Sequence, residues 1–252
     1  MLTYSRKLKL IWLLSAIISI YWLSTTTLPW YSILGLFYIS VFISRIGSEA
    51  AFHRYFTHRA FKTNKVMHYV LLWWGTLLGV GSCISWSCMH RAHHATSDTD
   101  DDPHSPHKLG YLRTFFLSPD VSKLTFKNVS DLVRDPAQNF CHRNYFKIVL
   151  TWIAFLGILS YWSMLPLVTL FAMPVCILWI MTGITNCLAH SVGYRNFETS
   201  DKSTNHHLTR WLLLNVGLHN NHHYKPTLID YNIKQRWYEF DLESYFIKLI
   251  KT

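Results

Sequence analysis

The chain has 252 residues, of which 50% are hydrophobic and only 15% carry a charge. Soluble domains usually carry about 25% charged residues, so this composition argues against a soluble protein. The formal net charge is +10, but the basic residues adjoin apolar blocks. This placement favours charge at a membrane surface over a nucleic-acid partner. The five cysteines form no CxxC pair, which indicates a reducing compartment.

Apolar segments of membrane-spanning length occur in two pairs. The first pair covers residues 10–28 and 31–48, and the second covers residues 145–162 and 165–187. A helix needs about 20 apolar residues to cross a bilayer, so we expect four spans in two hairpins. Basic residues precede the first span, and both hairpin turns are uncharged. The positive-inside rule therefore predicts a multi-pass protein whose polar regions lie in the cytoplasm.

A further apolar segment, residues 66–86, separates two groups of histidines. If it crossed the membrane once, these groups would lie on opposite sides and could not share a site. We therefore expect an in-plane or re-entrant helix, and a true span between unrelated histidines is the alternative. The expected fold is a single all-α membrane domain, residues 1–252, in which polar residues 95–145 and 191–252 form a cytoplasmic helical cap.

Histidine is concentrated in three short motifs. They are HRYFTH at residues 53–58, HRAHH at residues 90–94 and HNNHH at residues 219–223. On an α-helix, spacings of three and four residues place the histidines of HRAHH on one face. Clustered imidazoles are typical ligands of iron, zinc, copper and nickel. The candidate ligands are the motif histidines with His190: His53, His58, His90, His93, His94, His190, His219, His222 and His223.

Nine imidazoles exceed what one ion takes, so two metal ions are expected. A site of nitrogen ligands with open positions suits iron and oxygen chemistry. Structural zinc prefers cysteine-rich sites, and a metal transporter would place polar ligands inside its spans. His53 and His58 are five residues apart and do not share a face of an α-helix. Either the helix ends between them or each serves a different metal.

Other polar residues near the motifs have simpler interpretations. Glu49, one turn before His53, and Asp98 and Asp102 could each accept a hydrogen bond from a ligating imidazole. The alternative for these carboxylates is a solvated surface. The isolated histidines are expected to be structural: His68, His142, His206 and His207. The two histidines of the Asp-Pro-His-Ser-Pro-His loop, His104 and His107, are expected to lie outside the ligand set.

The order of the three motifs resembles that of the membrane fatty-acid desaturases of the Δ9 acyl-CoA or acyl-lipid type. Further similar tracts are WSCMHRAHHATSDTDDDPHSP, NCLAHSVGYRNF, HNNHHYKP and RWYEFDLESYFIKL, so the likeness covers nearly the whole chain. The resemblance implies four spans, an in-plane helix and two iron ions held by the nine histidines and, through water, by Asn186. It also implies that Trp86 and Thr182 lie beside the acyl chain, and that Arg195 and Asn196 contact the acyl carrier or head group.

The implied activity is O₂-dependent insertion of a cis double bond, at Δ9, into a saturated acyl chain on CoA or a lipid. An external donor of the ferredoxin or cytochrome b5 type would supply electrons. The alternatives are a related hydroxylase, alkane monooxygenase or ketolase, or a non-enzymatic metal-binding or transport protein. Many relatives have Gly-Glu before the last motif, whereas residues 215–218 here are Asn-Val-Gly-Leu, so one carboxylate is expected to be missing. No His-Pro-Gly-Gly haem motif occurs, so no fused cytochrome b5 domain is expected.

Overall fold

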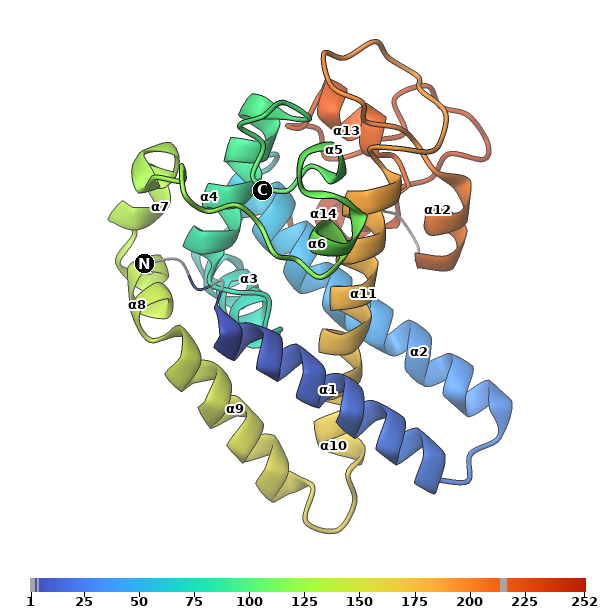
Figure 1. Cartoon of the computed structure of the whole chain (residues 1–252). Helices are drawn as coiled ribbons and strands as arrows, with labels where there is room; N and C mark the ends of the chain where they lie inside the picture. Colours follow the sequence, from blue (N-terminus) through green and yellow to red (C-terminus); the bar gives the residue numbers. More distant parts are fainter. Residues whose placement is uncertain (1–2, 4, 214–216) are drawn as a thin grey trace.

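The computed structural model describes residue 3, residues 5–213 and residues 217–252 (Figure 1). Asn215 and Val216, where the chain departs from the family's Gly-Glu, lie outside the described residues. Over the described ranges all regular structure is helical, apart from two isolated β-bridges. The expected all-α fold is confirmed.

Three helices in the described part of the chain are long and apolar enough to cross a membrane. They are α1 (Arg6–Thr25), the continuous helix of α2 (Trp30–Arg45) and η1 (Ile46–Thr57), and that of α10 (Leu165–Leu167), η3 (Val168–Ala172) and α11 (Met173–Leu188). The remaining expected span corresponds to α9 (Tyr145–Leu159), which has 15 residues. At about 1.5 Å per residue, α9 is shorter than the hydrocarbon core of a typical bilayer.

The long helices form two hairpins that pack through α11 (Figure 1). Helix α11 contacts both α1 and α2. Trp12 of α1 stacks on Trp179 of α11, with ring centroids 5.9 Å apart, and its Nε1 donates to the carbonyl of Gly79 at 2.7 Å. Buried apolar side chains such as Val149 and Val175 fill the space between α1, α9 and α11.

The structure divides residues 66–86 into two helices, so the expected continuous helix is wrong. Helix α3 (Lys65–Leu77) ends at a turn where Gly79 and Gly81 have φ values of +67° and +95°. Glycine adopts this left-handed backbone without a Cβ clash. The Ser82 side chain then caps α4 (Cys83–Thr96) by accepting from the Ser85 amide. With 13 residues, α3 is shorter than the roughly 20 residues that a membrane-spanning helix needs.

The first histidine motif lies on the π-helix η1. Its hydrogen bonds join residues five apart, as when the His58 amide donates to the His53 carbonyl at 3.0 Å. A close approach of α3 accompanies this winding, because a Cβ added to Gly75 would lie 2.3 Å from the Phe52 ring. The π repeat brings His53 and His58 to the same face. The helix ends at Thr57, so the expectation that it ends between His53 and His58 is confirmed. Their ring centroids are 4.8 Å apart, which argues against the alternative that each serves a different metal.

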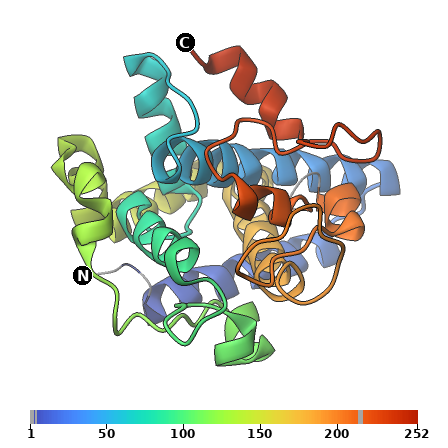
Figure 2. The same cartoon turned by 90° about the horizontal axis from the view of Figure 1, so that it is seen from above.

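Short helices and loops cover one end of the bundle (Figure 2). They are α5 (Pro106–Leu109), α6 (Tyr111–Phe115), η2 (Phe126–Val129), α7 (Ser130–Arg134), α8 (Pro136–Arg143), α12 (His207–Leu213), α13 (His219–Tyr224) and α14 (Leu242–Ile250). A buried ion pair ties this cap to η1, because Asp241 lies 2.8 Å from the Arg54 guanidinium. The cap thereby holds the last histidine motif, on α13, against the first.

Candidate metal centre

The nine candidate histidines converge as two adjacent groups of ligand atoms. The five-histidine cluster contains His53, His58, His90, His94 and His222. The four-histidine cluster contains His93, His190, His219 and His223. Within each cluster the ligand atoms lie within 4.8 Å of one another. The three motifs, distant in sequence, therefore lie together, and that they share a metal site stays a prediction.

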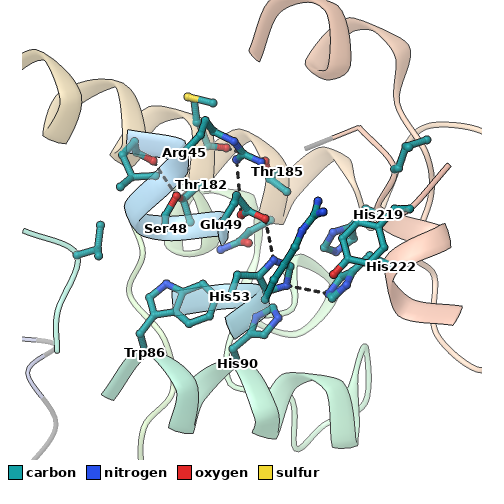
Figure 3. A pocket seen from close by; sticks show the side chains of 17 residues that line it. Arg45, Ser48, Glu49, His53, Trp86, His90, Thr182, Thr185, His219 and His222 are labelled. Atoms are coloured by element: carbon teal, nitrogen blue, oxygen red, sulfur yellow. Dashed lines mark hydrogen bonds and ion pairs between the residues drawn. The ribbon is translucent and has the colours of Figure 1, made fainter. Parts of the chain in front are cut away.

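In the five-histidine cluster the Nε2 atoms lie close together, and Figure 3 shows the rings of His53 and His222 facing each other. The Nε2 atoms of His53 and His222 are 3.1 Å apart, and those of His94 and His222 are 2.8 Å apart. His90 Nε2 lies 3.0 Å from His58 Nε2 and 3.1 Å from His94 Nε2. This cluster combines η1, α4 and α13, so it forms only when the cap is folded onto the bundle.

The four-histidine cluster has the same inward orientation. His190 Nε2 lies 2.9 Å from His219 Nε2. The Nε2 atoms of His93 and His223 are buried and have no hydrogen-bond partner among the described residues. A buried imidazole nitrogen without a partner is costly, and a metal ion at the cluster's centre would satisfy both atoms.

Carboxylates orient three of the four imidazoles in this cluster through their outer nitrogen. The Nδ1 atoms of His93, His190 and His223 lie 2.9 Å from Asp102, 2.8 Å from Asp98 and 2.7 Å from Asp201, respectively. A carboxylate on Nδ1 fixes the tautomer and makes Nε2 a stronger donor to a metal. The expected positions of Asp98 and Asp102 beside histidine ligands are therefore observed in the structure.

The five-histidine cluster has a different environment. Glu49 is 2.7 Å from His53 Nδ1, as its spacing in the sequence suggested. Tyr231 packs on His222 with ring centroids 5.0 Å apart, and His222 Nδ1 has no hydrogen-bond partner among the described atoms. The two clusters thus differ both in the number of imidazoles and in the number of supporting carboxylates.

Burial keeps these imidazoles in the form that binds a metal. Removal from water, and then the neighbouring imidazoles, hold the pKa of His90, His219 and His223 well below the usual value. Burial alone would raise the pKa of Asp98, but the hydrogen bond from His190 lowers it below its ordinary value. Neutral imidazoles supported by ionised carboxylates are the protonation states that metal binding requires.

A pocket opens beside the five-histidine cluster, between η1, α4 and α11 (Figure 3). Trp86 lines it and stacks on His90, with ring centroids 4.8 Å apart. Thr182 also lines it, although its hydroxyl donates to the Leu178 carbonyl at 2.7 Å. Asn186 and His219 line the same pocket. Acyl-chain contact by Trp86 and Thr182, and a water-mediated role for Asn186, stay predictions.

Arg195 and Asn196 have structural partners in the cap. The Arg195 guanidinium donates to the carbonyls of Thr199, Asp201 and Ser203. The Asn196 amide donates to Asn221 at 3.0 Å and to Glu239 at 2.8 Å. These bonds hold together the loop of residues 195–203 and connect it to Asn221 of α13. Contact with an acyl carrier or head group stays a prediction for both residues.

Several residues of the site were not anticipated from the sequence. Asp201 lies in a loop 22 residues before His223, and its carboxylate contacts His223 Nδ1. Arg45 lines the pocket, 3.5 Å from Glu49 and 2.6 Å from Glu243 of α14. His104, expected outside the ligand set, stacks on His93 with centroids 4.1 Å apart. An arginine and a glutamate four residues apart at the end of an apolar helix were the only sequence sign of this network.

Comparison with known proteins identifies this arrangement. The profile of a family described as fatty acid desaturase matches residues 28–245, which include all nine histidines. The chain belongs to the fatty acid desaturase family. The desaturase is 33% identical over 219 residues to an sn-1 stearoyl-lipid 9-desaturase of Anabaena variabilis, with 82% of this chain and 75% of the relative covered.

Two further relatives come from eukaryotes. A probable acyl-CoA desaturase of Schizosaccharomyces pombe is 32% identical, with 81% of this chain and 44% of the relative covered. A palmitoyl-monogalactosyldiacylglycerol delta-7 desaturase of Arabidopsis thaliana is 27% identical, with 88% and 60% covered. The chain therefore spans less than half the length of the fission-yeast relative. It is an oxidoreductase that desaturates fatty-acyl chains.

Proposed function

We propose that the desaturase inserts a cis double bond at Δ9 into a saturated acyl chain carried by a glycerolipid or CoA. The names of its relatives support this substrate class, since they include stearoyl-lipid 9-desaturases and an acyl-CoA desaturase. The observation that carries the proposal is the convergence of nine imidazoles beside a pocket at the end of the spans. We favour the lipid-linked substrate, because the match covers 75% of the Anabaena stearoyl-lipid desaturase but only 44% of the fission-yeast acyl-CoA desaturase.

Two iron ions, one in each histidine cluster, would supply O₂ activation and the removal of two hydrogens from unactivated methylenes. The nitrogen-rich donor set suits iron, and it contains no cysteine. His93, His190 and His223 would be held as Nε2 donors by their carboxylates, and His53 by Glu49. Two electrons and two protons, with the two substrate hydrogens, complete the reduction of O₂ to two waters.

The contribution of the chain is to position one pair of methylenes. Trp86 forms a flat wall against His90 and His53, with ring centroids 4.8 Å and 5.7 Å away. We expect the acyl chain to pass between this wall and α11 near Thr182, with Asn186 holding a water at the four-histidine cluster. A rigid pocket of this kind lowers the barrier by fixing the reacting carbons next to the metal site.

We propose that the desaturase crosses the membrane four times, with α9 extended by flanking residues, and carries its metal site on the cytoplasmic side. An acidic donor of the ferredoxin or cytochrome b5 type would dock near Lys225 and Lys234, both exposed. Lys234 lies 4.7 Å from the Phe197 ring, which stacks on Tyr224 at 4.0 Å. Tyr224 directly follows His223, so this surface leads to the four-histidine cluster.

The decisive experiment is expression in a host that lacks its own desaturase, followed by gas chromatography of the lipids and location of the double bond. We expect new cis-Δ9 acyl chains from the native protein and none from His94→Ala. His206→Ala removes a histidine that lies outside both clusters and should retain the product. A hydroxylated product without an alkene, or metal uptake with unchanged lipids, would overturn the proposal.

Donor docking is tested separately. Changing Lys225 and Lys234 to Glu should lower the rate at limiting ferredoxin about tenfold and weaken its dependence on ionic strength. Reduction by dithionite should be unchanged in the variant, because the metal ligands are untouched. Equal rates with ferredoxin for the native protein and the variant would show that the donor does not dock at this surface.

A further inference from the structure

Helix α14 presents an apolar stripe away from the protein. Leu242, Tyr245 and Leu249 are 42%, 64% and 84% exposed. Their spacing of three and four residues places them on one face of the helix. The opposite face is buried, with Ser244 and Ile247 fully covered. Helix α14 therefore has two faces: one packs into the protein, and the exposed apolar stripe does not contribute to the core.

Basic side chains flank this stripe. Lys248 and Lys251 are exposed at the C-terminal end of the helix, and the Nζ of Lys248 lies 5.2 Å from the Tyr245 ring. Lys62 and Lys65 are exposed on the adjoining segment. An apolar stripe with lysines at its margin is the pattern of helices that lie in the interface of an anionic membrane.

The stripe is continuous with the apolar surface of the bundle. The Thr252 amide donates to the Lys62 carbonyl at 3.0 Å, and the Thr63 hydroxyl donates to the Ile250 carbonyl at 2.5 Å. Helix α3 starts at Lys65 and exposes Val66 and Trp73. These side chains line a groove with Trp152 of α9 and Leu170 of η3. Figure 2 shows α14, in red, on the same side of the molecule as α3, in teal.

The buried face of α14 indicates its depth. Glu243 lies 2.6 Å from Arg45, which ends α2. Arg45 is the first charged residue after the apolar run of α2 and therefore marks the level at which the span leaves the hydrocarbon. A helix fixed to this residue lies at the membrane surface and not in the open solvent above the cap.

We infer that α14 is an interfacial helix that binds the lipid leaflet on the side of the metal site. Leu242, Tyr245 and Leu249 enter the acyl region. Lys251 contacts anionic head groups, and so does Lys248, whose Nζ also lies 2.9 Å from Asp230. The occupant of this surface is the bilayer itself. The inference rests on the membrane-embedded fold and is independent of the reaction that the site performs.

Spin labels in lipid nanodiscs test the depth of the helix. A nitroxide at Leu249→Cys is compared with one at Leu150→Cys, on the exposed face of α9, and one at Ser200→Cys, in an exposed cap loop. In nanodiscs with phosphatidylglycerol, collisions of the 249 label with O₂ should exceed those with Ni(II)EDDA, as at position 150. The label at position 200 should show the reverse. Tyr245→Cys provides a second position if the first variant folds poorly.

The same labels decide against the inference if the result differs. A preference for Ni(II)EDDA at position 249 would place α14 in water, and low accessibility to both reagents would indicate that protein covers it, such as a second copy of the chain. In pure phosphatidylcholine the 249 label should become more accessible to Ni(II)EDDA. The double variant Lys248→Gln, Lys251→Gln should lose this lipid dependence. If the 249 label has the same depth in both lipids while both lysines are present, the lysines do not contribute to membrane binding.

Discussion

Glu243 of the C-terminal helix lies 2.6 Å from Nε of Arg45, although 198 residues separate them. Arg45 is also 3.5 Å from Glu49, and Glu49 is 2.7 Å from Nδ1 of His53. One line of charged groups therefore connects α14 to a histidine of the five-histidine cluster. The cap orients the first motif as well as supplying the last one.

Removing the charge at Glu243 should weaken this connection. Glu243→Gln leaves Arg45 without the buried one of its two carboxylate partners, and breaking a buried ion pair costs about 3 kcal/mol. We expect a lower thermal midpoint in detergent and faster loss of iron to a chelator. Glu198→Gln, at an exposed position, is the matched control and should change neither. Equal iron loss from the two variants would show that α14 does not support the site.

The carboxylates of the four-histidine cluster should control metal retention there. Asp98→Asn, Asp102→Asn and Asp201→Asn each remove a charged acceptor from a histidine Nδ1, which we expect to weaken that metal about 10- to 100-fold. After competition with a chelator, each of these three variants should retain close to one iron per chain, as measured by iron analysis. Asp100→Asn, in the same acidic run but exposed, should retain two. Loss of both ions at the same chelator concentration would contradict separate sites.

The close contact of α3 with η1 should be sensitive to a single methyl group. Gly75→Ala places a Cβ 2.3 Å from Phe52, and such overpacking costs about 1–3 kcal/mol. Thermal unfolding and iron content should both fall, because Phe52 directly precedes His53. Gly157→Ala, where nothing lies within 4 Å, should be neutral or slightly stabilising. A Gly75 variant as stable as the Gly157 variant would show that η1 tolerates displacement.

The buried histidines should make the metal-free protein sensitive to mild acid. Burial holds the pKa of His58, His93 and His222 well below 6.5 in the folded chain. Below pH 6.5 the unfolded chain therefore binds more protons than the folded chain, so stability falls as the pH falls. Each such group contributes up to about 1.4 kcal/mol per pH unit. Thermal midpoints after chelation should be constant from pH 8 to 7 and decrease from pH 6.5 to 5, and an unchanged midpoint would contradict this.

The sequence predicted the nature of the site better than its local structure. The motif histidines, His190, Glu49, Asp98 and Asp102 could be found because their spacing and residue type indicate metal chemistry directly. The pairing of Asp201 with His223 could not, because it depends on how two loops fold against each other. Arg45 and Glu243 were missed for the same reason, since their contact exists only in the tertiary structure.

The errors in the helices have identifiable causes. Apolar residues continue through residues 66–86, so hydropathy alone predicts one helix, but left-handed Gly79 and Gly81 end it. The π-helix η1 was also not predicted, because the expected spacing of faces assumed 3.6 residues per turn. His53 and His58 therefore appeared to be on different faces, whereas they serve the same cluster.

The central claim is that nine histidines hold two iron ions that act together. The most direct measurement is the desaturation rate of purified, metal-free protein as iron is added stepwise, with the bound iron counted in each sample. We predict little activity at one iron per chain and a plateau at two. A plateau at one iron per chain, or full activity without iron, would contradict the account.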